Sequence, residues 1–171
     1  MDTLLDKVRK IPDFPKKGIL FYDLTTVFSD PVEFGNIIEA MAEPFFKKKV
    51  EVVCAVEARG FILGSALAND LGAGFVPIRK KGKLPSKTIE CSYELEYGTD
   101  TLEMHEDAIL EGQKVLIVDD LLATGGTAKA AVDLVKQCKG EIAGISFVME
   151  LMDLKGRENI QDQNIYSLLK V

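Results

Sequence analysis

The sequence predicts an α/β fold with a central, mainly parallel sheet flanked by helices. Two patterns indicate it: short, almost wholly apolar runs rich in β-branched residues recur along the chain, and amphipathic helical stretches separate them. Strands that are apolar throughout are typical of parallel sheets covered on both faces. The alternation requires βαβ crossovers, so ligands are expected outside the carboxyl ends of the strands.

The first predicted helix follows Asp30, which is expected to cap it, and runs to about Lys47. Pro31 suits the first helical position, and Glu33 is placed to reach back to the cap. The apolar residues that should cover the sheet recur at helical spacing: Phe34, Ile37, Ile38, Met41 and Phe45.

The core elements follow in alternation. Buried strands are predicted at 50–56, 74–78, 114–118 and 142–149, and helices at 61–71 and 128–139. Gly72 and Gly140 are expected to end these two helices, because glycine readily adopts the left-handed conformation found at helix C-termini.

A different pattern separates the second and third of these strands. Apolar residues alternate with polar ones from Ile89 to Tyr97, a turn begins at Gly98, and the alternation resumes at Leu102. This predicts an antiparallel hairpin with one solvent-facing side, projecting from the core sheet as a flap (about residues 79–105). A basic segment lies at its base: Arg79, Lys80, Lys81, Lys83 and Lys87. Such a run is also typical of a solvated loop.

The composition is that of a globular protein: 171 residues, 47% hydrophobic and 28% charged. No repeat or linker divides the chain, so residues 1–171 are expected to form one domain. Cys54, Cys91 and Cys138 are odd in number and scattered, which favours a reducing compartment, the cytoplasm. The net charge of −6 disfavours nucleic acid as a partner, and the absence of a signal sequence and of a long apolar run disfavours export and a membrane.

The strongest chemical signal is a buried strand that ends in two carboxylates, Asp119 and Asp120, and is followed by a turn of small residues and a helix. The turn consists of Ala123, Thr124, Gly125, Gly126 and Thr127. Its glycines let backbone amides converge, its hydroxyls can donate, and the helix dipole favours an anion, so the turn is predicted to bind a phosphate. The two aspartates would repel that phosphate, so they are expected to face hydroxyls or a hydrated Mg²⁺. A tight turn capped by Thr127, beside two solvated acids, is the alternative.

Two other nucleotide-binding motifs are absent. The chain has neither GxxxxGK[ST] nor a GxGxxG after a strand, which disfavours a P-loop NTPase and a Rossmann dehydrogenase. His105 is the one histidine, so a Ser/His/Asp or Cys/His apparatus is not expected, and His105 is predicted to be structural.

The segment 115–128 resembles the phosphoribosyl pyrophosphate-binding signature of type I phosphoribosyltransferases. Further matches, over nearly the whole chain, resemble the members of that family that act on adenine; they lie at 11–15, 18–21, 57–61, 78–85, 92–93, 95–98 and 119–127. The resemblance implies an N-terminal hood (about 1–30) over the base and a flexible flap. It also implies an enzyme of purine salvage that transfers the 5-phosphoribosyl group from phosphoribosyl pyrophosphate to adenine, giving AMP and pyrophosphate.

The resemblance assigns the phosphoribosyl pyrophosphate site. The 5′-phosphate would lie on residues 123–127 and the ribose hydroxyls would face Asp119 and Asp120. Mg²⁺ would be carried by the substrate, reaching either aspartate only through water. The other residues that it places at this substrate are Arg59, Arg79, Lys80, Lys83 and Tyr97. In similar dimeric enzymes some of the basic residues reach the neighbouring subunit's site, so a homodimer is implied. From the residues alone, an Arg59 paired with Glu57 at the start of a helix is the other interpretation.

The base site and the catalytic acid also come from the resemblance. The aromatic ring of Phe21 would stack on adenine while the main chain of Leu20 and Tyr22 reads its edge, although the family usually has arginine where this chain has Tyr22. Glu96 matches a flap glutamate that addresses N7 of the base, and Arg59 is the second implied catalytic residue. By its position on the hairpin alone, Glu96 would simply face solvent. A core-packing role is the default for Phe21.

Two other functions share these features. One is a phosphoribosyltransferase for another purine base, which would have the same phosphate site and differ only in the hood and flap. The other is a non-catalytic regulator of the same fold that senses purines or phosphoribosyl pyrophosphate, for which a DNA-binding extension would be expected.

Overall fold

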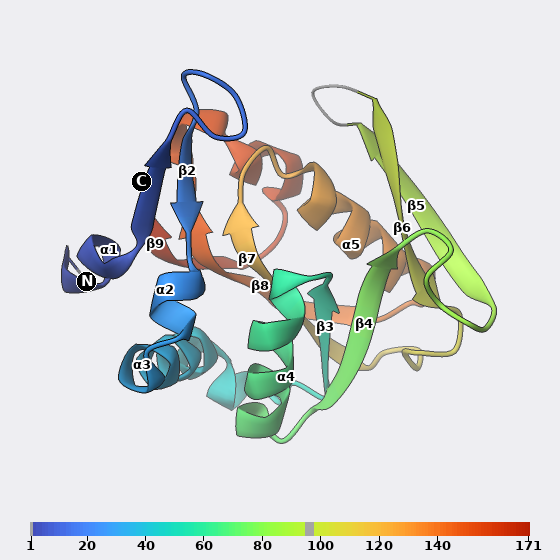
Figure 1. Cartoon of the computed structure of the whole chain (residues 1–171). Coiled ribbons are helices and arrows are strands. Elements are labelled where there is room, and N and C mark those ends of the chain that lie inside the picture. Colours follow the sequence, from blue (N-terminus) through green and yellow to red (C-terminus); the bar gives the residue numbers. More distant parts are fainter. Residues whose placement is uncertain (1, 95–97) are drawn as a thin grey trace.

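The computed structural model describes residues 2–94 and 98–171 and contains a seven-stranded sheet with helices on both sides (Figure 1). The strand order is β5-β6-β4-β3-β7-β8-β9, and the five strands from β4 to β9 are parallel. The strands are β3 (Val52–Val56), β4 (Gly74–Lys80), β5 (Thr88–Glu94), β6 (Thr99–His105), β7 (Lys114–Leu122), β8 (Glu141–Glu150) and β9 (Ile165–Lys170). The predicted fold class, a mainly parallel sheet flanked by helices, is confirmed.

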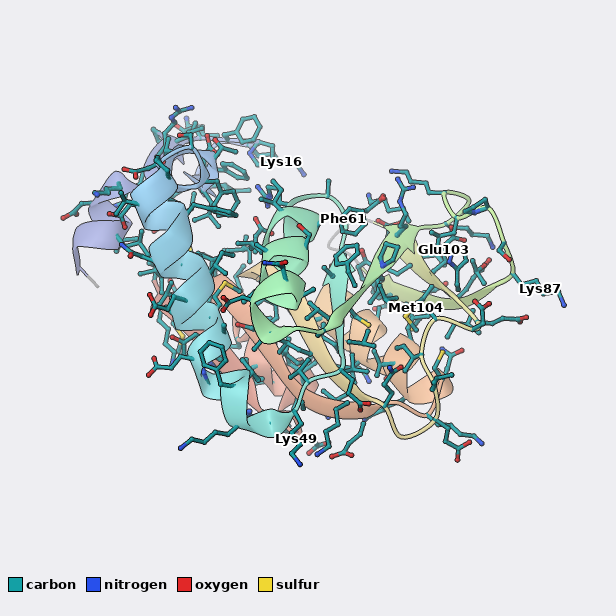
Figure 2. The ribbon with its side chains drawn as sticks, turned by 90° about the horizontal axis from the view of Figure 1, so that it is seen from below. Lys16, Lys49, Phe61, Lys87, Glu103 and Met104 are labelled. Atoms are coloured by element: carbon teal, nitrogen blue, oxygen red, sulfur yellow. The ribbon has the colours of Figure 1, made fainter. Side chains whose placement is uncertain are left out.

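The main helices are α3 (Pro31–Ala42), α4 (Arg59–Leu71) and α5 (Gly126–Gln137). β3 shows why they cover both faces of the sheet: Val53 and Ala55 pack with α3 and α4, whereas Cys54 and Val56 pack with α5. All five residues of β3 are buried, as expected for a strand whose alternate side chains both meet a helix layer. Figure 2 shows α3 beside α4.

The predicted start of α3 is correct and its predicted end is wrong. The Asp30 carboxylate accepts hydrogen bonds from the backbone N–H groups of Val32 and Glu33, as a helix cap does. The Glu33 carboxylate pairs with Lys7 rather than with the cap. The α-helix stops at Ala42, and a 3₁₀ turn, η1 (Glu43–Lys48), follows. Pro44 explains the change, because proline has no N–H to continue the α-helical hydrogen bonds.

The two later helices end differently. Gly72, with φ of 64°, closes α4 in the left-handed conformation as predicted. The residue with that conformation after α5 is Lys139, with φ of 59°, and not Gly140. Gly140 is needed for space instead, because a methyl group there would lie 2.9 Å from Val135 Cγ1. Gly140 therefore does not end α5 by adopting a left-handed conformation, and that prediction is wrong.

The predicted hairpin is present as β5 and β6, and the partly buried side of β5, which includes Cys91 and Tyr93, packs into the core beside α5. It does not simply project from the core sheet. Strand β6 pairs with β4 through Arg79 opposite Glu103 and Lys80 opposite Leu102, so the hairpin extends the sheet by two antiparallel strands. The predicted strand at 74–78 continues to Lys80, which makes this pairing possible.

The N-terminal segment forms a small sheet of its own. Strand β1 (Arg9–Pro12) pairs antiparallel with β2 (Leu20–Asp23), and the short helices α1 (Asp2–Lys7) and α2 (Thr25–Phe28) flank this two-stranded sheet. Figure 1 shows its connecting loop rising on one side of the carboxyl end of β7 while the β5–β6 hairpin rises on the other. Within residues 2–94 and 98–171, no helix has the length and apolar character needed to cross a membrane.

Candidate active site

Two cavities adjoin at the carboxyl ends of β3 and β7. The smaller, of about 70 Å³, is formed chiefly by residues 121–128. The larger, of about 410 Å³, is lined by groups from β3, α4, β4, β5 and β7. Asp119, Leu121 and Thr127 line both cavities, so the two adjoin along these residues. Its position agrees with the ligand position expected for a parallel α/β sheet.

The small cavity is built by the turn that joins β7 to α5. Gly125 adopts φ of 86°, a left-handed conformation that a residue with a Cβ adopts only under strain, and the helix begins at the next residue. The first amides of a helix have no partner within the helix, and they carry the positive end of its dipole. Since a single water needs only roughly 10–15 Å³, the cavity has room for a tetrahedral anion. Phosphate binding by residues 123–127 remains a prediction.

Asp119 and Asp120 lie near the end of β7, which runs on to Leu122. Asp120 is only 4% exposed, so a pair of solvated acids is the wrong interpretation. The backbone N–H of Asp120 donates to Asp119 Oδ1 at 2.9 Å. Burial raises the pKa of Asp119 well above its ordinary value, and the neighbouring carboxylate adds to this shift. Burial also raises the pKa of Asp120, against the opposing charge of Arg59. Both acids face the larger cavity.

Arg59 begins α4 and pairs with Asp120, not with Glu57. Its Nε lies 2.7 Å from Asp120 Oδ2, and its guanidinium carbon lies 5.8 Å from the ring centre of Phe21. The interpretation of Arg59 as a partner of Glu57 is thus wrong. One cation links the acid at the end of β7 to the aromatic ring of the N-terminal hairpin.

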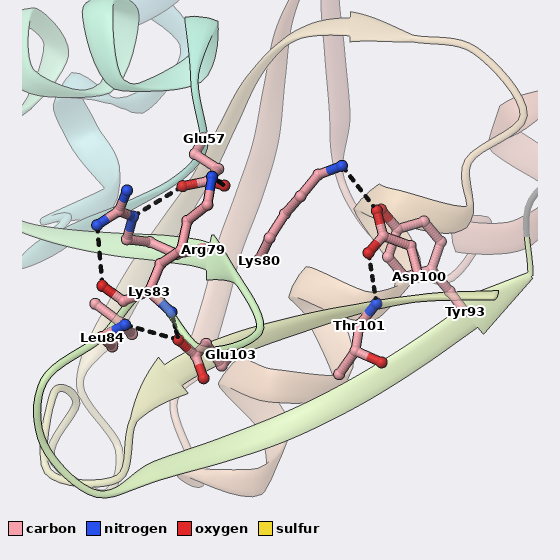
Figure 3. Close-up of polar contacts among 9 residues, drawn as sticks. All are labelled: Glu57, Arg79, Lys80, Lys83, Leu84, Tyr93, Asp100, Thr101 and Glu103. Atoms are coloured by element: carbon pink, nitrogen blue, oxygen red, sulfur yellow. Dashed lines mark hydrogen bonds and ion pairs between the residues drawn. The ribbon is translucent and has the colours of Figure 1, made fainter.

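Glu57, at the end of β3, instead holds two cations of the basic segment. Its carboxylate accepts from Arg79 Nε at 2.8 Å and from Lys83 Nζ at 2.6 Å (Figure 3). The Glu57 side chain is 6% exposed. Burial raises its pKa, but the hydrogen bonds from Lys83 and Arg79 outweigh burial and bring the pKa below its ordinary value. The segment is therefore held by ion pairs, and the solvated-loop interpretation is wrong for Arg79 and Lys83.

The remaining cations of this segment also have acidic partners. Lys80 Nζ lies 3.0 Å from Asp100 Oδ2 across the β4–β6 pair (Figure 3), and Lys80 lines the larger cavity. Lys81 pairs with Glu90 at 2.8 Å. Lys87, which is mostly exposed, lies 4.0 Å from Glu106.

Glu103 has a structural role that the sequence did not indicate. It is 3% exposed and lies in β6. The Glu103 Oε1 atom accepts from the backbone N–H groups of Lys83 and Leu84, each at 2.8 Å (Figure 3). Burial raises the pKa of Glu103, but these amides lower it by more. The carboxylate therefore fixes the turn that carries Lys83.

The predicted base-binding residues lie together on β2. Phe21 contacts Phe14 edge to face, with ring centres 5.2 Å apart. Leu20 is 44% exposed, and Tyr22 is partly buried against the core on the α3 and α4 side. Because Arg59 lies over Phe21, the hood reaches the larger cavity through that arginine.

Glu96 and Tyr97, the predicted catalytic acid and a predicted substrate contact, lie outside the described residues. The strand before them approaches the small cavity. A methyl group at Gly126 would lie 3.2 Å from the Tyr93 ring and 3.3 Å from the Glu94 carbonyl oxygen, so β5 lies across the start of α5. Tyr93 also lines the larger cavity. The family resemblance covers residues 92–93 but assigns no role to Tyr93.

His105 lies in β6 at the end remote from the hairpin turn, opposite Thr88. It is not among the residues that line the two cavities. Among the described side chains, no group of three or more His, Cys, Asp and Glu residues is arranged to hold a metal ion.

The parallel sheet and the site at the end of β7 define a phosphoribosyl transferase domain: the model of that family matches residues 27–169. The adenine phosphoribosyltransferase of Koribacter versatilis is 57% identical over 168 residues, which cover 98% of this chain and 92% of the relative. The crystal structure of the Thermoanaerobacter pseudethanolicus adenine phosphoribosyltransferase has a TM-score of 0.96, 50% identity and 99% coverage of both chains. The Saccharomyces cerevisiae enzyme, complexed with an imino-altritol bisphosphate and adenine, has a TM-score of 0.93, 42% identity and coverage of 98% and 97%. The chain therefore belongs to the adenine phosphoribosyltransferase family.

Proposed function

We propose that the protein transfers the 5-phosphoribosyl group of phosphoribosyl pyrophosphate to adenine, giving AMP and pyrophosphate in purine salvage. The observation that carries this proposal is that the two cavities adjoin and share Asp119, Leu121 and Thr127 as lining residues. A small cavity at a helix N-terminus suits a phosphate, and the larger cavity beside it has room for a sugar and a second anionic group. The names of the relatives, and the adenine in the yeast complex, support adenine as the base.

The site suggests how the substrates lie. The 5′-phosphate would bind the amides and hydroxyls of residues 123–127. The ribose hydroxyls would then face Asp119 and Asp120, whose oxygens can accept hydrogen bonds. The pyrophosphate would lie toward the cations, namely Arg59, Arg79, Lys80 and Lys83. Phe21 would stack on adenine, with the main chain of Leu20 and Tyr22 at the edge of the base.

The residues present fit a magnesium ion that arrives with the substrate. Two adjacent carboxylates supply the hard oxygen atoms that Mg²⁺ prefers. The described residues form no complete protein cage, so pyrophosphate oxygens and water would supply most ligands. When bound, Mg²⁺ would offset the charge of the departing pyrophosphate. Asp119 and Asp120 would hold it through water, as Mg²⁺ sites usually retain several water ligands.

The reaction would displace pyrophosphate from the anomeric carbon through an oxocarbenium-like transition state, with N9 of adenine as the attacking atom. Arg59 and the basic segment would stabilise the negative charge that develops on the leaving group. As N9 of the N7–H tautomer bonds to the anomeric carbon and pyrophosphate leaves, N7 must lose its proton, and Glu96, directly or through water, would accept it; in the reverse reaction Glu96 would return the proton to N7 as an acid. General acid–base catalysis of this kind contributes about 10²- to 10⁴-fold in rate. Closure of the flap, with Tyr97 on the substrate, would exclude water that could hydrolyse the activated sugar.

We further propose a homodimeric enzyme of the cytoplasm, with neither nucleic acid nor a membrane as partner. The three cysteines are free, which suits a reducing compartment. The net charge of −6 disfavours polyanionic partners. Sedimentation velocity over a range of protein concentrations would test the dimer.

A base-panel assay tests the activity. The protein is incubated with Mg²⁺, labelled phosphoribosyl pyrophosphate and, in turn, adenine, hypoxanthine, guanine and xanthine, and the labelled nucleoside monophosphates are separated. We expect AMP to form at least about 100-fold faster than the other products, because unpaired polar groups in a base site discriminate strongly. Preferential formation of IMP or GMP would overturn adenine as the substrate, and no product with any base would overturn the activity.

A further inference from the structure

The segment η3 (Gly156–Ile160) lies directly against the turn at residues 123–127. Asn159 Nδ2 donates a hydrogen bond to the carbonyl oxygen of Thr124 at 2.7 Å. The backbones also interlock. A methyl group added at Gly156 would overlap the carbonyl oxygen of Ala123, and one added at Gly125 would overlap the carbonyl oxygen of Gly156. The two segments can approach this closely only because both positions lack a Cβ.

This segment is itself anchored to the sheet through Arg157. The guanidinium donates from Nε and Nη2 to the two carboxylate oxygens of Glu150, at 2.6 Å and 2.8 Å. It also donates to the carbonyl oxygen of Ile165 and to Ser167 Oγ, each at 3.3 Å. Glu150 is 2% exposed and ends β8, the strand beside β7. A two-point ion pair with a buried acid fixes the direction of the arginine, so η3 rests on a rigid support.

We propose that Asn159 and Gly156 are positioning residues for the phosphate site. Accepting the proposed function, they hold the turn at 123–127 in its binding conformation before the 5′-phosphate arrives. A trans peptide directs its N–H opposite to its C=O, so a hydrogen bond to the Thr124 carbonyl sets the direction in which the Gly125 amide can donate. A turn of five small residues has little side-chain packing of its own. Contacts from outside the turn hold it in place, so less conformational entropy is lost when the ligand binds.

Ribose 5-phosphate is the direct probe, because it carries the phosphate and lacks both pyrophosphate and base. Asn159→Ala and Asn159→Leu both remove the donor, and the leucine keeps most of the volume. The matched control is Glu158→Gln, at the exposed neighbouring position in the same segment. Binding of ribose 5-phosphate is measured by calorimetry, the KM for each substrate and kcat by steady-state kinetics, and folding by thermal unfolding.

We expect both Asn159 variants to bind ribose 5-phosphate about 3- to 10-fold more weakly, as loss of one hydrogen bond predicts. The KM for phosphoribosyl pyrophosphate should rise by a similar factor, while the KM for adenine and the unfolding midpoint stay close to wild type. Glu158→Gln should match wild type throughout. Gly156→Ala should weaken ribose 5-phosphate binding by more than the Asn159 variants do, because its methyl group must displace the turn.

Equal binding of ribose 5-phosphate by wild type and both Asn159 variants would overturn this proposal and leave the enzymatic activity intact. A parallel rise in both KM values with a lower unfolding midpoint would also overturn it, since that result describes a general loss of structure. A wild-type chain that binds no ribose 5-phosphate would overturn the proposed function, and the positioning role with it.

Discussion

Arg59 and Asp120 form an ion pair across the carboxyl ends of the sheet, with Nε 2.7 Å from Oδ2. The acid is almost fully buried and the arginine is partly exposed at the start of α4. The pair joins the cation proposed for pyrophosphate to an acid proposed for ribose, so any group that binds one of them alters the surroundings of the other. Removing one partner of a buried ion pair leaves the other charge without compensation, so a change at either residue should affect binding.

Asp120→Asn should lower kcat/KM for phosphoribosyl pyrophosphate by about 10- to 150-fold, the range expected when a hydrogen bond to a charged group is lost. Steady-state kinetics with each substrate varied in turn gives the measurement. Asp133→Asn is the control, because Asp133 lies on α5 and pairs only weakly with Lys129 at 3.3 Å. Wild-type kinetics in Asp120→Asn would show that Asp120 does not contribute to ribose binding.

The stability of Asp119→Asn relative to wild type should depend on pH. Burial raises the folded-state pKa of Asp119 well above its unfolded value, so its contribution to stability is present at low pH and is lost as pH rises through the folded pKa. Asparagine cannot ionise, so the free energy of unfolding of the variant relative to wild type should increase as pH rises from the unfolded-state pKa of about 3.9 through the raised folded-state pKa, by about 1.4 kcal/mol for each unit by which the two differ. Urea unfolding at several pH values measures it. The same difference at every pH would contradict the raised pKa.

Glu57→Gln should strengthen inhibition by pyrophosphate. The Glu57 carboxylate forms ion pairs with Arg79 and Lys83. Pyrophosphate, which is proposed to bind these cations, must therefore compete with Glu57. Removing the negative charge should lower the inhibition constant of pyrophosphate by about 3- to 10-fold, as loss of one competing charged contact implies. Glu106→Gln is the control, since Glu106 is half exposed and approaches only Lys87. Weaker inhibition in Glu57→Gln would mean that Glu57 positions the two cations rather than competing for them.

Gly125→Ala and Gly112→Ala form a matched pair. Both glycines have positive φ, of 86° and 78°, and each alanine should cost about 1–2 kcal/mol of stability. Only the Gly125 methyl group would meet Gly156, whereas nothing lies within 4 Å of the Gly112 position. The KM for phosphoribosyl pyrophosphate should therefore rise at least about 10-fold in Gly125→Ala alone. Equal kinetics in the two variants would show that the turn tolerates displacement.

Phe21→Leu should raise the KM for adenine by about 5- to 100-fold, the effect of losing an aromatic ring stacked on a base. The KM for phosphoribosyl pyrophosphate should change little. Phe46→Leu is the control, because Phe46 is 54% exposed and lies in η1, away from the two cavities. An unchanged KM for adenine would mean that Phe21 does not bind the base and serves its contacts with Phe14 and Arg59.

The core and the phosphate turn were predictable because their signals are local. A strand such as β3 is apolar on both faces, and the order strand, acid pair, small-residue turn and helix can be read along 14 residues from Val115 to Ala128. The cap at Asp30 is equally local. Pro44 was also a local signal against a longer helix, and that prediction failed because the apolar stripe continues past it to Phe45.

The charge pairing was not predictable in the same way. Arg79 and Lys83 meet Glu57, and Lys83 is held in place by Glu103 from a later strand, so each contact depends on the order of strands in the sheet. The pairing of β3 with β4 brings Glu57 to Arg79, and the pairing of β4 with β6 brings in Glu103; neither pairing leaves a pattern in one strand alone. The support of the phosphate turn by Asn159 joins segments 35 positions apart, and a lone asparagine in a polar stretch carries no signal of such a contact.

The engagement of Arg79 and Lys83 by Glu57 also affects how the protein should respond to ionic strength. When a polyanion enters this site, Arg79 and Lys83 exchange one negatively charged partner for another. Few mobile counterions are therefore released. Screening by dissolved salt weakens bare, exposed charges much more than charges already neutralised inside a protein. Despite its many cations, the site should therefore keep most of its affinity at elevated salt concentration.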